Sequence, residues 1–75
     1  MTKLPLLSAH EVIKALSKIG FIQVAQKGSH IKLKRKEESK TWIVIVPNFK
    51  EIPRGTLRSI IRQSGLDQDE FLKLL

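Results

Sequence analysis

Apolar positions in the first quarter of the chain recur with the period of a helix. Between residues 8 and 20 they are three or four apart, which predicts an amphipathic helix with its apolar face formed by Ala9, Val12, Ile13, Leu16 and Ile19. Ser8 is followed three residues later by Glu11, a capping box that marks a helix start. Gly20 predicts where this helix stops.

Three stretches in the middle of the chain have the composition of β-strands. They are predicted over 21–26, from residue 30 to about 35, and over 41–46. Residues 27–29 form the first turn, and 36–40 a polar hairpin loop. The third stretch is β-branched and aromatic throughout, which is typical of a central strand covered on at least one side. Two short hairpin connections imply an antiparallel sheet.

A helical pattern returns towards the end of the chain. A helix is predicted from near Pro53 to Gly65, with Leu57, Ile60 and Ile61 facing the core, followed by a short helix that opens at 67–70. The order predicts an α+β fold, in which helices pack on one face of a three-stranded antiparallel sheet and leave the other open. With 75 residues, the chain has room for one small domain over 1–75. We therefore expect function on an open surface.

Basic residues concentrate in the middle of the chain. The chain has 14 Lys+Arg and 7 Asp+Glu, a net charge of +7. Residues 27–62 contain ten basic and three acidic side chains, so ten minus three accounts for the whole +7. A polyanion such as nucleic acid is the expected partner. The alternative is an ordinary solvated basic surface.

Several classes of chemistry find no support in the sequence. There is no cysteine, so disulfides and thiolate metal sites are excluded, and a cytoplasmic protein fits. A zinc site needs three or four clustered ligands, and the chain has two histidines, one at a helix start and one on a strand, so we do not expect a metal site. Ser29 and His30 are adjacent and would point apart in a strand, which disfavours a serine-hydrolase triad. The apolar start is too short for a signal peptide, and no segment approaches a membrane span. His10 falls on the solvated face of its helix.

His30 begins a strand in which Lys32 and Lys34 follow at every second residue. These three side chains would share one face, while Ile31 and Leu33 take the other. An imidazole accepts a proton near neutral pH, and RNA offers one on its 2′-hydroxyl. Lysines would offset charge developing on the phosphate. The alternative is a histidine that only hydrogen-bonds phosphate or caps a turn, and the residues alone leave both open.

A second basic pattern lies in the predicted helix after Pro53. Arg54, Arg58 and Arg62 repeat every four residues, as either a solvated face or an edge that tracks phosphates together with the strand lysines. The single tryptophan, Trp42, favours core packing over base stacking. The residues predicted to hold an RNA backbone are Lys27, Ser29, Lys32, Lys34, Arg54 and Arg58.

These features occur together in the order and spacing of a known family. The marks are Val12-Ile13-Lys14-Ala15-Leu16, Gly20-Phe21, Gln26-Lys27-Gly28-Ser29-His30, Val46-Pro47, Glu51-Ile52, the run from Gly55 to Gln63, Gly65-Leu66 and the run from Glu70 to Leu75. From about Leu7 to Leu75 the chain resembles the HicA-type toxins of prokaryotic toxin–antitoxin pairs, also grouped as YcfA-like proteins.

The resemblance implies a fold like the double-stranded RNA-binding domain and an endoribonuclease that cuts mRNA without a cofactor. It implies that His30, in the Gly-Ser-His motif, is the catalytic histidine, and that a HicB-type antitoxin is the partner. Many members carry a second histidine shortly after the Val-Pro pair, where Phe49 aligns here, so activity is expected to be lower or replaced by RNA binding. We expect an mRNA-cleaving toxin. The rivals are an RNA-binding module without cleavage, and a structural subunit whose basic face docks an acidic protein.

Overall fold

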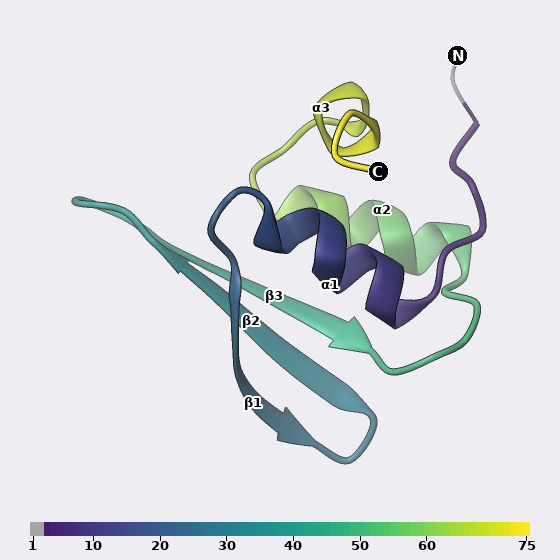
Figure 1. Ribbon diagram of the computed structural model, residues 1–75, viewed down its shortest axis with the longest axis horizontal. Coiled ribbons are helices and arrows are strands. Elements are labelled where there is room, and N and C mark those ends of the chain that lie inside the picture. Colours follow the sequence, from purple (N-terminus) through teal and green to yellow (C-terminus); the bar gives the residue numbers. More distant parts are fainter. Residues whose placement is uncertain (1–2) are drawn as a thin grey trace.

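A computed structural model describes residues 3–75 and shows a small sheet with its helices gathered on one side (Figure 1). The elements in chain order are α1 (Ala9–Ser17), β1 (Ile22–Lys27), β2 (His30–Lys36), β3 (Thr41–Pro47), α2 (Arg54–Gln63) and α3 (Gln68–Leu72). This order confirms the predicted α+β fold. Met1 and Thr2, which belong to the domain predicted over 1–75, lie outside the described residues.

The predicted start of helix α1 is confirmed at the level of single hydrogen bonds. The Ser8 hydroxyl accepts from the Glu11 backbone N–H at 3.1 Å, and the Glu11 carboxylate accepts from the Ser8 N–H at 3.0 Å. The two backbone N–H groups would otherwise be unpaired at the helix end. Gly20 follows the helix with a φ of +100°, a conformation that glycine adopts without strain. Asp67 and Glu70 form the same reciprocal cap on α3.

The three strands form an antiparallel meander in the order β1-β2-β3. The prediction that 41–46 is a central strand is therefore wrong, because short hairpins place the second strand in the middle and leave β3 at an edge. The apolar composition of β3 reflects instead the burial of one of its faces, where Val44 and Val46 are fully covered. Part of its outer edge is also protected, since the Gln63 side-chain oxygen accepts from the Ile45 N–H at 2.9 Å.

The core lies between the helices and one face of strands β2 and β3. Its most completely buried members include Leu33, Val44, Val46, Val12, Leu16, Leu57, Ile60 and Phe71. Strand β1 contributes nothing to this core, because every one of its six residues is exposed. Figure 1 shows why: β1 is the strand farthest from the helices. None of the helices in residues 3–75 is both long and apolar enough to cross a membrane.

An aromatic and charged cluster holds the base of the β2–β3 hairpin against the helix layer. The Arg35 guanidinium lies 5.6 Å from the centre of the Phe21 ring and 5.7 Å from that of Trp42. The Glu37 carboxylate pairs with Arg35 at 2.8 Å and accepts from the Trp42 indole N–H at 3.0 Å. Trp42 is half-buried against the core, which confirms its predicted packing role.

Candidate nucleic-acid interface

The alternation predicted for the second strand is present. His30, Lys32 and Lys34 are exposed on the face that the helices do not cover, while Ile31 and Leu33 are buried on the other. Lys36 continues the exposed series at the end of β2. Alternate residues of a strand are about 6.6 Å apart, so this row presents one imidazole and three ammonium groups over about 20 Å. We call these four residues the β2 row.

The β1–β2 turn brings a further cation beside His30. Lys27 is the strand partner of His30, so the two side chains lie on the same face. Gly28 has a φ of +58° and Ser29 has a negative φ, the combination typical of a type II′ hairpin turn. The Ser29 carbonyl accepts from the Asn48 N–H at 2.6 Å, which fixes the turn against the end of β3. The structure therefore brings together four of the predicted RNA contacts with His30: Lys27, Ser29, Lys32 and Lys34.

Apolar side chains flank the β2 row on both sides. Lys32 lies between Ala25 of β1 and Ile45 of β3, and Lys34 lies between Ile22 and Ile43. The isoleucines are substantially exposed, Ile22 most of all at 67%. The open face is thus a strip of positive charge bordered by aliphatic surface, which suits a ligand that offers anionic and apolar groups together.

The predicted arginines lie elsewhere. Arg54 and Arg58 are on α2, in the layer that covers the opposite face of the sheet. Gln63, on the flank of α2 that meets the edge of β3, is about 140° around the helix from Arg58. Arg54 is half-buried, and its Nε donates to the Leu4 carbonyl at 2.7 Å. The structure does not place either arginine beside the strand lysines.

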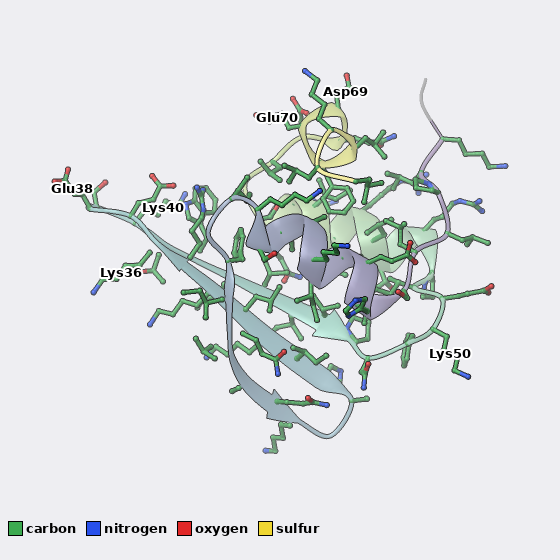
Figure 2. The ribbon with its side chains drawn as sticks, in the orientation of Figure 1. Lys36, Glu38, Lys40, Lys50, Asp69 and Glu70 are labelled. Atoms are coloured by element: carbon green, nitrogen blue, oxygen red, sulfur yellow. The ribbon has the colours of Figure 1, made fainter. Side chains whose placement is uncertain are left out.

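The acidic residues of α3 lie away from the open face, whereas Glu37 and Glu38 lie in the β2–β3 hairpin next to Lys36. Figure 2 shows Asp69 and Glu70 on α3, beyond α1 and α2 as seen from the sheet, whereas Lys36 and Lys40 project from the β2–β3 hairpin. Among residues 3–75, no three His, Cys, Asp or Glu side chains lie close enough together to hold a metal ion. A hollow of about 230 Å³ is lined by Lys14 of α1, by Lys18 just after this helix, and by Leu74 and Leu75, in the layer behind the sheet.

Two exposed residues were not predicted as part of this site. The sequence prediction places Lys36 in the hairpin loop, although the alternation that begins at His30 includes it. In the sequence, Phe49 stands out only as the residue that aligns with a family histidine. The structure places it just beyond Pro47, the β3 partner of His30, with its side chain 46% exposed. Nothing in the sequence indicates that this apolar side chain lies outside the core.

Comparison with known families agrees with the site. The family model described as HicA toxin of bacterial toxin-antitoxin matches residues 9–66, well over half of the chain. The match includes helix α1, all three strands and helix α2, and so the whole open face. A comparison with individual curated proteins finds no match.

Proposed function

The chain belongs to the HicA toxin family of bacterial toxin–antitoxin systems, and from this we propose that it is an endoribonuclease that cleaves mRNA at His30 without a metal ion. One observation carries the proposal. A solvent-exposed imidazole stands at the end of a lysine row, on a sheet face that no other described element covers. This surface can accept an RNA strand and offer it a proton acceptor.

The proposed chemistry uses the ribose as nucleophile. The His30 imidazole takes the proton of a 2′-hydroxyl, and the resulting oxygen attacks the adjacent phosphorus. The bond from phosphorus to the 5′-oxygen breaks, and that oxygen takes a proton from water at this open surface. The products are a 2′,3′-cyclic phosphate and a free 5′-hydroxyl. Lys27 and Lys32 lie on the same face and would offset the charge that develops on the phosphate oxygens.

RNA binding without cleavage is the second candidate function. It is favoured by the presence of one imidazole in the β2 row, since acid–base catalysis of this reaction is most efficient with a separate acid and base. The other histidine, His10, is exposed on α1, on the flank opposite Val12. The same surface would then hold RNA in place without cutting it.

Cleavage of RNA by purified protein decides between the two. We expect the wild type to cut in the presence of EDTA and to leave 2′,3′-cyclic or 3′-phosphate ends. His30→Ala should abolish cutting and growth inhibition while the protein stays folded, because an exposed side chain contributes no core contact. His10→Ala is the matched control and should cut normally. Cutting by His30→Ala at near the wild-type rate, or cutting of a substrate with 2′-deoxyribose at the cleaved position, would show the mechanism to be wrong.

HicA toxins pair with an antitoxin, and a HicB-type protein is the partner we propose for this chain. The open face carries the excess of positive charge together with exposed isoleucines, so a partner with acidic and apolar groups would be steered to it and retained there. An antitoxin on this face would cover His30 and block RNA directly.

A further inference from the structure

Phe49 is the exception among the aromatic residues of this chain. The sequence has three phenylalanines, one tryptophan and no tyrosine. Phe21 and Phe71 are buried and Trp42 is half-buried, whereas Phe49 is 46% exposed. A ring of this size normally contributes to a small core, and here it is instead available to contact a ligand near the open face.

The backbone around Phe49 is fixed although its side chain is exposed. The Phe49 N–H donates to the Pro47 carbonyl at 2.8 Å, and its own carbonyl accepts from the Ala9 N–H at the start of α1 at 2.9 Å. On either side, Asn48 donates to Ser29 and Ile52 donates to Leu7, at 2.6 and 2.7 Å. The ring is therefore carried on a rigid backbone, and little backbone entropy would be lost when it contacts a ligand.

This support is joined directly to the proposed catalytic residue. Pro47 is the strand partner of His30, and paired Cα atoms lie about 5.5 Å apart. Two further chain steps of about 3.8 Å reach Phe49, so its Cα lies at most about 13 Å from that of His30. A nucleotide next to one bound at His30 lies within that reach. Lys50 follows in the chain, and its ammonium group extends from this loop into solvent (Figure 2).

We propose that Phe49 stacks on an unpaired base next to the nucleotide at His30 and so holds single-stranded RNA in register for cleavage. This rests on the proposed function. Bases inside a duplex are not accessible to such a ring, whereas splayed bases of single strands stack on aromatic side chains without regard to sequence. The β2 row would hold the phosphates, and the ring would bind a base.

The test measures RNA binding separately from cleavage. Protein carrying His30→Ala, which keeps the substrate intact, is titrated with a single-stranded oligoribonucleotide that contains 2-aminopurine, a base whose fluorescence falls on stacking. Phe49→Ala in this background should weaken binding roughly 5- to 100-fold, as loss of one base–aromatic stack does, and should remove the quenching. Phe49→Trp should retain both. Phe49→Leu, which is apolar but lacks a ring, should behave like Phe49→Ala.

Controls separate the stack from other roles. Leu75→Ala removes an equally exposed apolar side chain at the C-terminus and should leave RNA affinity unchanged. In protein with His30 intact, Phe49→Ala should raise KM with little change in kcat, because the stack forms in substrate and transition state alike. Unfolding curves should show that each variant is folded.

Two outcomes would overturn the proposal. Full affinity in Phe49→Leu would mean that an aliphatic contact suffices. Unchanged RNA binding in Phe49→Ala, with weaker binding of the antitoxin, would assign the ring to a protein partner. Absence of cleavage by the wild type would refute the proposed ribonuclease activity. The titration would still show independently whether Phe49 stacks on a base.

Discussion

At the scale of single residues, side chains of the same type have different roles according to their element. Lys32 and Lys34 have no buried neighbours on the open face, so their charge is available to a ligand. Arg54 has the same charge, yet it holds the N-terminal segment to α2 by donating to Leu4, fifty residues away in sequence. As RNA contacts, Arg54 and Arg58 stay predictions.

The arginine and lysine positions can be separated by experiment. Arg54→Ala should lower the free energy of unfolding by about 1–2 kcal/mol, because a half-buried, charge-assisted hydrogen bond is lost. Arg58→Ala is the exposed control and should change stability by less than about 0.5 kcal/mol. Lys32→Ala should weaken RNA binding more than either arginine substitution does. Denaturant unfolding and RNA titration of the three proteins provide the comparison, and an Arg58→Ala effect on RNA that equals that of Lys32→Ala would extend the interface to α2.

At the scale of elements, the packing of α2 on the sheet includes one close approach that only glycine allows. Gly65, just after α2, has a φ of +80°, and a Cβ atom added there would lie 2.6 Å from the Trp42 ring. The backbone of Gly65 therefore packs directly against the Trp42 indole of β3, where no side chain would fit.

Substitution of glycines tests the close contact between Gly65 and Trp42. Gly65→Ala should destabilise the protein by about 2–4 kcal/mol, since it adds backbone strain to a steric overlap with a packed ring. Gly55→Ala in α2 is the matched control, because its Cβ would meet nothing within 4 Å. That change should be neutral or stabilising by up to about 1 kcal/mol. Thermal unfolding of the two variants is the measurement, and equal melting temperatures would contradict the proposed packing.

The sequence predicts the local features of each element better than it predicts which elements and residues lie next to one another in the fold. The capping box at Ser8, the alternation from His30 to Lys34 and the apolar face of α2 are all confirmed, because each depends on residues a few positions apart. The assignment of 41–46 as central was wrong, since apolar composition reports burial of a face and not position in a sheet. The Arg54–Leu4 bond and the exposure of Phe49 depend on tertiary contacts that no local pattern encodes.

At the scale of the whole molecule, the strand lysines and the acidic residues of α3 lie on opposite sides. The β2 row and Lys27 lie on the open side of the sheet, while Asp69 and Glu70 lie on α3 behind the helix layer (Figure 2). The net charge of +7 is therefore unevenly distributed. A polyanion approaching from solution is attracted most strongly to the open side of the sheet.

Salt dependence measures how many lysines contact phosphate. The logarithm of the RNA association constant should fall linearly with the logarithm of salt concentration, by about 0.7 for each phosphate contact on a single strand. The double variant Lys32→Gln with Lys34→Gln should therefore reduce the slope by about 1.4. Lys73→Gln, beside α3, should not change it. An unaltered slope in the double variant would remove these lysines from the RNA contact.

The antitoxin should compete with RNA for the same face. Reversal of charge in Lys32→Glu with Lys34→Glu is expected to weaken both RNA binding and antitoxin binding, and antitoxin association should slow as salt rises. Stopped-flow association at two ionic strengths provides the rates. A toxin–antitoxin complex that still binds RNA normally, with His30 exposed, would contradict occlusion of the site.

The exposure of all six β1 residues has a consequence for the motions of the site. This strand is held by hydrogen bonds to β2 and by almost no side-chain burial, so it should detach in local openings that leave the rest of the protein folded. Amide hydrogens of Ile22–Lys27 that bond to β2 should exchange with solvent deuterium far faster than those between β2 and β3. Each such opening would also carry Lys27 away from His30. A ligand that spans both strands would then slow the exchange, which gives a direct reading of occupancy at the open face.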